Sequence, residues 1–205
     1  MPLKELPIQN TYRTGLNHLV NDLLVPCLKK ANLYRRAVGY FSSFSLASAA
    51  QGAANFFYQG GEMRLVASPN LQPEDIEALN QGYADPHEIL KICCWRSLEE
   101  LEDQLIKDRL NVLAWLAATR KLKVKLALRK KPDGNFSSGL YHEKIGIFSY
   151  EAEHVVFIGS ANETLGGFEN NFESVSVFRS WTDVEGRVEE HLKHFEKLWS
   201  NQASC

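Results

Sequence analysis

Apolar and polar residues alternate along the chain with two different periods, and the changes of period outline helices and strands. Leucines recur at helical spacing over residues 16–28, and residues 34–41 then alternate as in a strand. Small residues at about 45–58 indicate a second helix, which ends at a pair of glycines and leads into a strand over 63–67. The first third of the chain therefore predicts the order helix, strand, helix, strand.

The rest of the chain continues in the same mixed manner. A helical region is expected over about 86–119, and we treat residues from about 73 to 119 as a helical insertion. Residues 121–128 alternate as in a strand with one buried face and one basic face. Further strands are predicted at about 141–148, 154–160 and 172–179, followed by an amphipathic helix over 182–199. This mixture predicts the α/β class.

The composition is that of an ordinary globular protein, with 205 residues of which 44% are hydrophobic and 23% charged. A chain of this length can form a hydrophobic core without disulfides or structural metal, so we expect one domain over residues 1–205. The four cysteines show no C-x-x-C spacing, and we interpret them as reduced, buried thiols. They are Cys27, Cys93, Cys94 and Cys205.

The charge and hydropathy of the sequence indicate where in the cell the protein is expected, but they say little about its function. The net charge of −2 implies no general field for nucleic acid, so any affinity for anions has to come from local clusters. No segment reaches the roughly 18 consecutive apolar residues of a membrane span, and the first residues lack the apolar core of a signal peptide. We therefore expect a cytoplasmic protein with no membrane partner.

A His-x-Lys sequence occurs twice, and only the first copy has the geometry of a shared site. A chain of this composition should contain ~0.4 such tripeptides by chance, so the sequence alone carries little information. His191 and Lys193 fall on the predicted C-terminal helix, where residues two apart point to different sides. His142 and Lys144 fall on a predicted strand, where the same spacing places both side chains on one face.

The next predicted strand ends in a second signal, Gly159-Ser160-Ala161-Asn162. A Gly-Ser-x-Asn sequence within about twenty residues of His-x-Lys has a joint chance expectation of ~0.002. Because Ser160 and Asn162 are two residues apart, they share a face of the strand or its end. A hydroxyl, an amide, an ammonium and an imidazole can therefore converge on one pocket, which suits a tetrahedral phosphate.

These residue types have complementary roles towards a phosphodiester. Lys144 can neutralise a phosphate oxygen, and Ser160 and Asn162 can donate hydrogen bonds to it. His142 can attack phosphorus if a carboxylate holds its other ring nitrogen as N–H. Glu173 is our candidate for that carboxylate.

These pieces together resemble the signature of the phospholipase D superfamily, in its one-motif nuclease branch. More narrowly, the chain is similar to the phospholipase D-like domain found N-terminal to some bacterial superfamily II helicases. The segments that carry the resemblance are 142–148, 159–164, 171–174 and 177–181, with looser likeness at 34–43 and 64–69. The resemblance therefore extends over most of the chain.

The resemblance implies a mixed central sheet flanked by helices on both faces. It implies a metal-independent phosphodiesterase that needs no cofactor and forms a phosphohistidine intermediate. The family's mechanism uses two His-x-Lys sets and this chain supplies one, so a homodimer with His142 of both subunits near a two-fold axis is expected. A helicase or other ATPase, as a partner or a fused domain, is the further partner that the resemblance implies.

One position departs from the superfamily pattern. Where the superfamily usually has an Asp five residues after the motif Lys, this chain has Ser149, and the connection to Gly159 is longer. The one-motif, metal-independent restriction endonucleases also resemble this sequence in lacking that Asp, which is a structural group in the family. We therefore expect the difference to concern local turn geometry rather than activity.

A local excess of positive charge precedes the His142 strand. Residues 109–132 contain no Asp or Glu, but they contain eight basic residues: Arg109, Arg120, Lys121, Lys123, Lys125, Arg129, Lys130 and Lys131. The run could be a solvated strand face that discourages edge pairing, or it could contact the phosphate backbone of a nucleic acid, and both readings stay open. We take the last six as candidate nucleic-acid-binding residues.

Several other features have plainer interpretations. Glu173 could form an ion pair with Arg179 instead of acting in catalysis. Gly166-Gly167 is interpreted as a turn. His191 and His194 are interpreted as a solvent-facing pair, so no metal site is expected there. The four tryptophans are interpreted as core or interface anchors.

The leading hypothesis is a metal-independent phosphodiesterase that acts on DNA, a nuclease that works as a homodimer in restriction or anti-phage defence. The alternative is a non-catalytic module that binds a nucleic-acid phosphate and targets a helicase or other partner. A lipid phosphodiesterase is disfavoured, because no amphipathic or apolar membrane-docking segment is evident.

Overall fold

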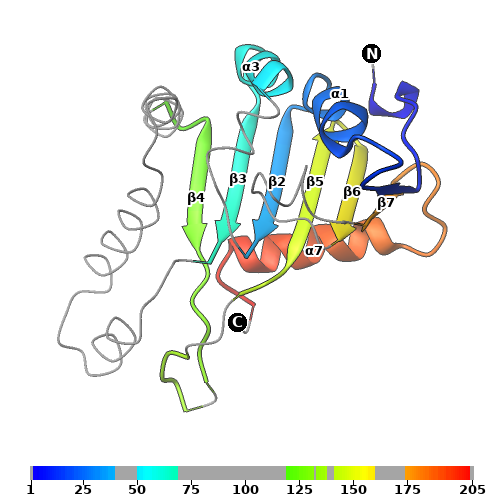
Figure 1. Cartoon of the computed structure of the whole chain (residues 1–205). Helices are drawn as coiled ribbons and strands as arrows, with labels where there is room; N and C mark the ends of the chain where they lie inside the picture. Colours follow the sequence, from blue (N-terminus) through cyan, green and yellow to red (C-terminus); the bar gives the residue numbers. More distant parts are fainter. Residues whose placement is uncertain are drawn as a thin grey trace.

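A seven-stranded mixed sheet forms the centre of the computed structural model (Figure 1), which describes residues 2–39, 50–68, 119–131, 133–137, 141–159 and 174–203. The strands are β1 (Thr11–Arg13), β2 (Leu33–Val38), β3 (Glu62–Ala67), β4 (Leu122–Leu126), β5 (Lys144–Tyr150), β6 (Glu153–Gly159) and β7 (Ser174–Arg179). Their order across the sheet is β1-β7-β6-β5-β2-β3-β4. β2, β3 and β4 run parallel, whereas the pairs from β2 through β5, β6 and β7 to β1 are antiparallel.

These strand directions bring several strand ends to one edge of the sheet. β2, β3, β4 and β6 end there, and β5 and β7 begin there. In the register, Val38 at the end of β2 lies opposite Lys144 at the start of β5. Gly159 at the end of β6 lies opposite Val175 near the start of β7. We call this the lower edge, because it lies at the bottom of Figure 1.

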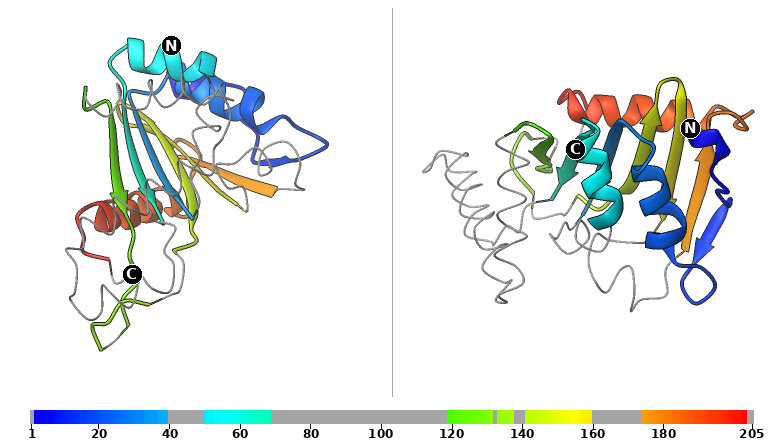
Figure 2. Two further views of the ribbon diagram at one scale, coloured as in Figure 1. Left: turned by 60° about the vertical axis from the view of Figure 1, so that its left-hand side comes forward. Right: turned by 90° about the horizontal axis from the view of Figure 1, so that it is seen from above.

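Helices cover both faces of the sheet (Figure 2). One face carries α3 (Ala50–Tyr58) and α1 (Val25–Leu28), which continues a π-helical turn, η2 (Val20–Leu24). The other face carries the longer helix α7 (Arg187–Trp199), and a short 3-10 helix, η1 (Leu3–Glu5), lies near the N-terminus. The expected α/β class, with a mixed central sheet between helices, is confirmed.

The core consists of two layers, because successive strand residues point to opposite faces of the sheet. On the side of α1 and α3, the rings of Tyr34 and Phe148 stack with centres 4.5 Å apart, and Phe157 stacks on Phe148 at 5.7 Å. On the side of α7, Ile147 and Phe195 are fully buried in a second cluster. β5 is therefore buried on both faces over most of its length.

Most of the predicted elements are found, with shifted ends. The six strands expected from the sequence correspond to β2–β7 in chain order. They were predicted at about 34–41, 63–67, 121–128, 141–148, 154–160 and 172–179. Helix α7 begins at Arg187 rather than near 182, since Gly186 has a φ of 76° and Asp183 accepts a hydrogen bond from the Val188 N–H at 2.7 Å. β1 was not predicted, because three residues are too few to show an alternation.

The predicted buried face of the strand over 121–128 is only partly found, because Leu126 and Leu128 are half-buried. Val124 was expected on the buried face, yet it is 50% exposed. The reason is that β4 is the last strand in the order of the described sheet, so it has a neighbouring strand on one side only. Leu122, by contrast, is buried as expected.

Two further expectations concern the cysteines and the insertion. Cys27 is buried and not in a disulfide, as expected, and burial raises the pKa of its thiol. The predicted helical insertion at 73–119 and the other three cysteines lie outside the described residues. Among the helices that the structure describes, none has the length and apolar character to cross a membrane.

Candidate active site

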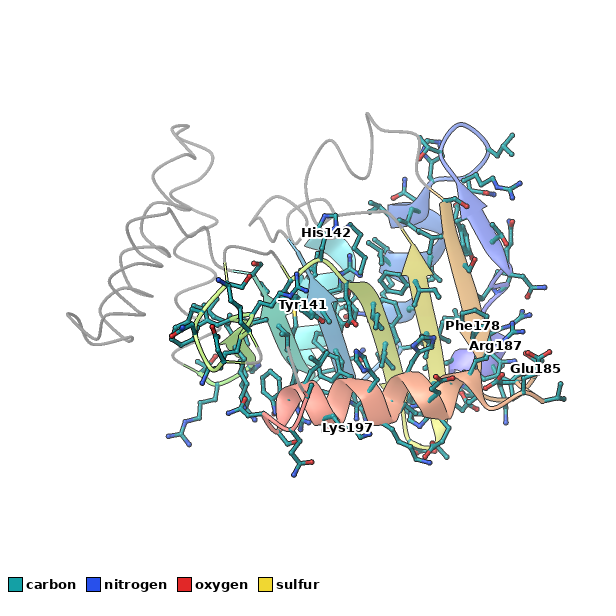
Figure 3. The ribbon with its side chains drawn as sticks, turned by 90° about the horizontal axis from the view of Figure 1, so that it is seen from below. Tyr141, His142, Phe178, Glu185, Arg187 and Lys197 are labelled. Atoms are coloured by element: carbon teal, nitrogen blue, oxygen red, sulfur yellow. The ribbon has the colours of Figure 1, made fainter. Side chains whose placement is uncertain are left out.

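The side chains of His142 and Lys144 touch at the lower edge of the sheet, where Figure 3 labels His142. Lys144 is the first residue of β5, and His142 lies two residues before the strand begins. The Nζ atom of Lys144 is 2.9 Å from Nε2 of His142 and 3.4 Å from its carbonyl oxygen. The strand starts later than predicted, but both side chains lie on the same side, as the period of two requires.

This contact indicates which nitrogen of the exposed His142 ring accepts a hydrogen bond. A lysine ammonium group has only donors, so we infer that Nε2 of His142 accepts the hydrogen bond. In that arrangement Nδ1 is the donor nitrogen of the ring. The accepting lone pair of Nε2 therefore faces the ammonium group of Lys144.

Gly39 lies against the His142 ring and leaves no room for a side chain. A Cβ atom at Gly39 would lie 2.7 Å from Cδ2 of His142 and 3.1 Å from the carbonyl oxygen of Tyr141. Carbon atoms in contact are normally about 3.5–4.0 Å apart, so any side chain at this position would displace the ring. The sequence did not single out this glycine, because its role depends on the pairing of β2 with β5.

Tyr141 and Glu143, which flank His142, have polar partners on the α7 side of the sheet. The Tyr141 hydroxyl donates to Oε2 of Glu143 at 2.7 Å. The Nε2 atom of His194, in α7, lies 2.9 Å from both carboxylate oxygens of Glu143. The prediction of a solvent-facing His191–His194 pair did not include this contact: the His194 side chain is 38% exposed, and packing of α7 on the sheet also brings its ring to Glu143.

His191 lies in a different environment from His194. Its ring stacks on Phe178 of β7, with centres 6.1 Å apart. Burial lowers the pKa of His191, because burial disfavours the charged ring. The described part of the chain contains no group of three or more His, Cys, Asp or Glu residues arranged for a metal.

Several residues proposed from the sequence lie outside the described part of the chain: Ser160, Asn162, Gly166, Gly167 and Glu173. The structure describes the strands on either side of them. β6 ends at Gly159 and β7 begins at Ser174, and both points are at the lower edge. The described chain therefore reaches Gly159 and resumes at Ser174 at the edge where His142 lies.

The sequence matches a protein-family model described as "Cardiolipin synthase, PLD-like domain" over residues 40–199, which is more than half of the chain. The chain belongs to this PLD-like domain family. A search among curated proteins finds no match.

Solved structures share the fold of this PLD-like domain. NucT from Helicobacter pylori superposes with a TM-score of 0.52 at 16% identity, covering 93% of this chain and 95% of that one. Nuc from Salmonella typhimurium, a phospholipase D family member, has a TM-score of 0.51 at 14% identity, covering 93% of each chain. Phosphatidylserine synthase from Haemophilus influenzae has a TM-score of 0.53 at 10% identity, covering 91% of this chain and 38% of that one. Because the sequence identities are this low, the superpositions show a common fold and do not show a common function.

Ser149 occupies the position where the superfamily usually has an Asp, and it is the centre of a polar network. Its side chain is buried, and its Oγ accepts a hydrogen bond from Nη1 of Arg35 at 2.9 Å. The same Oγ lies 2.9 Å from Nδ1 of His154. Burial, reinforced by the charge of Arg35, lowers the pKa of His154. The network joins β2, β5 and β6 at the end of β5 away from His142.

The three lysines around β4 have partners within the protein. Lys121 donates to a backbone carbonyl at the end of α3, at 2.6 Å. Lys123 forms an ion pair with Glu62 at 2.6 Å, and Lys125 donates to the carbonyl of Trp199 and lies over its indole ring. These contacts place the ammonium groups of Lys123 and Lys125 on the α7 side, where they hold β4 against its neighbours.

The remaining candidates, Arg129, Lys130 and Lys131, are exposed on a hairpin that extends from β4 (Figure 1). Lys130 pairs with Phe136 across the hairpin, and its ammonium group lies 5.3 Å from the centre of the Phe136 ring. The backbone N–H of Lys131 donates to the carbonyl of Asn135 at 2.8 Å. We call residues 129–131 and 133–137 the basic hairpin. It projects from the lower edge of the sheet.

Arg36 is a buried charge that the sequence analysis did not single out. It lies on β2 and is fully buried, with its guanidinium carbon 5.0 Å from the centre of the Phe157 ring. The signal in the sequence is an arginine at an otherwise apolar position of an alternating strand. Trp181 and Trp199 pack against the two core clusters, as expected of anchors.

Arg179 is the residue with which Glu173 could form an ion pair instead of acting in catalysis. Its guanidinium donates to the carbonyl of Ile8 at 2.7 Å and to the side chain of Asn10. These contacts tie the N-terminal segment to β7. Glu173 lies outside the described residues, so its pairing with Arg179 stays a prediction.

Proposed function

We propose that the protein is a phosphodiesterase that cleaves DNA with His142 as the nucleophile. The observation that carries the proposal is the 2.9 Å contact between Nζ of Lys144 and Nε2 of His142 at an exposed sheet edge. One phosphate group could contact both the imidazole nitrogen and the ammonium group at this distance. The chain's membership of the PLD-like domain family supports the same chemistry.

In the first step, a phosphate oxygen replaces His142 as the partner of Lys144. Ser160 and Asn162 donate hydrogen bonds to the phosphate oxygens, and Glu173 accepts the Nδ1–H of His142. The lone pair of Nε2 then attacks phosphorus. An N–P bond forms while the P–O bond to the leaving oxygen breaks, which gives a phosphohistidine.

The second histidine of the reaction comes from a homodimer. The partner subunit's His142 begins protonated and donates its proton to the leaving oxygen. It then removes a proton from water, the water oxygen attacks phosphorus, and the N–P bond breaks to regenerate His142. An isologous interface supports this arrangement, because it brings a residue next to its own copy. The reaction needs no metal and no cofactor.

The basic hairpin is the proposed contact to the DNA backbone. Arg129, Lys130 and Lys131 are exposed at the edge of the sheet where His142 lies, whereas Lys121, Lys123 and Lys125 have partners inside the protein. Exposed cations bind phosphates by displacing counterions. The hairpin therefore supplies the affinity for a polyanion that the net charge of −2 does not supply.

Hydrolysis assays in EDTA test this function. The wild type should cleave DNA and bis(p-nitrophenyl) phosphate, and His142→Ala should bind DNA in a gel shift without cleaving it. Lys193→Ala is the matched control from the second His-x-Lys sequence, and it should keep full activity. If the wild type binds DNA and cleaves neither substrate, the enzyme proposal is wrong and a non-catalytic module that targets a helicase or other partner is favoured.

The biological setting rests on the resemblance to helicase-associated domains. A cytoplasmic nuclease in restriction or anti-phage defence is the setting that we propose. Cells that express the wild type should restrict phage growth more strongly than cells that express His142→Ala, and equal plaque counts would contradict the setting without affecting the chemistry.

A further inference from the structure

The segment that carries His142 is held from both sides of the sheet. On one side, Gly39 allows β2 to approach the His142 ring closely. On the other side, the Glu143 carboxylate accepts hydrogen bonds from the Tyr141 hydroxyl and from His194 of α7. The contact to His194 joins residues that are 51 positions apart in the sequence.

We propose that Glu143, Tyr141 and His194 form a clamp that positions His142 for attack on phosphorus. The inference rests on the proposed role of His142 as nucleophile, and it assigns the three clamp residues a positioning role. None of them touches the substrate in this proposal. They act on the reaction only through the backbone of His142.

The alternation of the chain explains how the clamp reaches His142. Tyr141 and Glu143 flank His142 directly, and their side chains lie on the α7 side, whereas His142 and Lys144 lie on the other side. Because His142 precedes the first strand pairing of β5, the ladder of backbone hydrogen bonds does not fix it. Fixing both neighbouring side chains limits the rotation of the backbone at His142.

The clamp is anchored in a rigid part of the fold. His194 lies next to Phe195, which is fully buried, and Leu198 one turn later is also buried. Tyr141 is only 9% exposed and packs in the same cluster as Phe195. The ring of His194 therefore has a fixed position relative to β5.

The solvent exposure of the Glu143–His194 contact indicates that it positions His142 rather than stabilises the whole fold. The side chains of Glu143 and His194 are each 38% exposed, and polar contacts this accessible contribute little to global stability. Removal of either partner should therefore leave the fold intact. Its effect should be confined to the placement of the neighbouring His142.

Steady-state kinetics with bis(p-nitrophenyl) phosphate test the clamp. Glu143→Ala and His194→Ala should each lower kcat by about 10- to 100-fold, because a nucleophile misplaced by about 1 Å loses rate on this scale. KM should change less than twofold, because Lys144 is unaltered. The double variant should be no slower than the slower single variant, as expected for two residues that act as one unit.

Conservative variants and a matched control complete the kinetic test. His194→Gln keeps an N–H donor and should recover most of the rate, whereas His194→Leu should not. Lys193→Ala changes the neighbouring residue of α7, whose partner is Glu189, and it should have wild-type kinetics. Wild-type kcat in Glu143→Ala, or a loss of rate that follows a loss of melting temperature, would overturn the clamp.

A readout without turnover keeps this test separate from the proposed function. The imidazole resonances of His142 in long-range ¹H–¹⁵N spectra should be sharp in the wild type and broadened or shifted in Glu143→Ala. If the wild type cleaves no substrate but this change occurs, the proposed function fails, and only the placement of the His142 ring by the clamp stands. If the wild type cleaves and the His142 resonances are the same in both proteins, the clamp fails and the function stands.

Discussion

The Nζ atom of Lys144 lies 2.9 Å from Nε2 of His142, so the two side chains on which the proposed chemistry depends are in direct contact. The contact orients Nε2 of His142 towards the ammonium group of Lys144, beside the position that we propose for the phosphate. In the proposed mechanism, a phosphate oxygen displaces His142 from Lys144 and frees the lone pair at the moment of binding. In that mechanism the pair couples substrate binding to activation of the nucleophile.

Replacement of Lys144 by Ala should weaken both phosphate binding and turnover. A charge-assisted hydrogen bond is worth about 1.5–3 kcal/mol, which corresponds to about 10- to 150-fold in kcat/KM. The measurement is hydrolysis of bis(p-nitrophenyl) phosphate together with inhibition by inorganic phosphate. Lys197→Ala, an exposed lysine of α7, is the control. Equal activity of Lys144→Ala and the wild type would remove Lys144 from the site.

Gly39→Ala should abolish most activity while the protein stays folded. The added methyl group would lie 2.7 Å from Cδ2 of His142, so the ring has to move away from its contact with Lys144. Circular dichroism and hydrolysis assays check the two parts of this expectation. In contrast, Gly60→Ala meets no atom within 4 Å but sits at a φ of 86°, so it should cost stability and leave kcat unchanged. The prediction fails if Gly39→Ala is fully active.

Neutralisation of the basic hairpin should reduce DNA affinity without changing the chemistry on a small substrate. The triple variant Arg129→Ala, Lys130→Ala, Lys131→Ala removes three exposed charges. The slope of log affinity against log salt should become shallower by about 2–3, because each contacted phosphate contributes about 0.9. Gel shifts or fluorescence anisotropy measure this slope.

The control for the hairpin variant is the pair Lys193→Ala, Lys197→Ala on α7, which should leave the slope unchanged. Hydrolysis of bis(p-nitrophenyl) phosphate should be normal in both proteins, since the hairpin contacts the polymer and not the reacting group. An unchanged salt slope in the triple variant would exclude the hairpin as the DNA contact.

Stability should fall as the pH decreases below the ordinary pKa of histidine, in part because of His154. Its pKa is lowered in the folded protein by burial and by Arg35, so between that value and 6.5 the unfolded chain binds more protons. The contribution of His154 is therefore complete above pH 6.5 and is lost as the pH falls through its folded pKa. Urea unfolding at pH 5–8 measures the change.

His154→Gln should make the dependence of unfolding free energy on pH shallower in this window. A residual slope is expected from His191, whose pKa is also lowered by burial. His18→Gln, which changes an exposed histidine outside the Ser149 network, is the matched control. A His154→Gln profile that coincides with the wild type would show that the network does not respond to pH.

A shared active site predicts a dimer whose activity depends on both subunits. Sedimentation should give a dimer for the wild type. When equal amounts of wild type and His142→Ala are refolded together, activity should fall to about one quarter, because only wild-type pairs have both histidines. Independent subunits would give about one half, and a strict monomer that cleaves DNA would contradict the model outright.

The elements of the fold could be read from the sequence where periodicity is local and long enough. The alternation over 34–41 and 141–148 gave β2 and β5, and the same alternation placed His142 and Lys144 on one side. The three-residue strand β1 was missed because it has no measurable period. Val124 was misplaced because its burial depends on a neighbour of β4 rather than on β4 itself.

The candidate site could be predicted only as a set of residue types. His142, Lys144, Ser160, Asn162 and Glu173 were proposed from spacing and chance, and the structure describes the first two. The lysines of β4 looked like a free basic face, but Glu62 and Trp199 bind two of them. These partners lie about 60–75 positions away along the chain, and no local pattern encodes them.

By itself, the sequence determined the α/β class, the order of most elements and the shared face of His142 and Lys144, because side-chain direction within a strand follows from the backbone period alone. Only the tertiary structure decided that Gly39 lies against the His142 ring, that His194 reaches Glu143, and that the basic hairpin rather than β4 presents free charge. The Gly39–His142 and His194–Glu143 contacts, and the partners that bind the lysines of β4, join segments far apart in the chain. Whether such segments meet depends on strand pairing and helix packing.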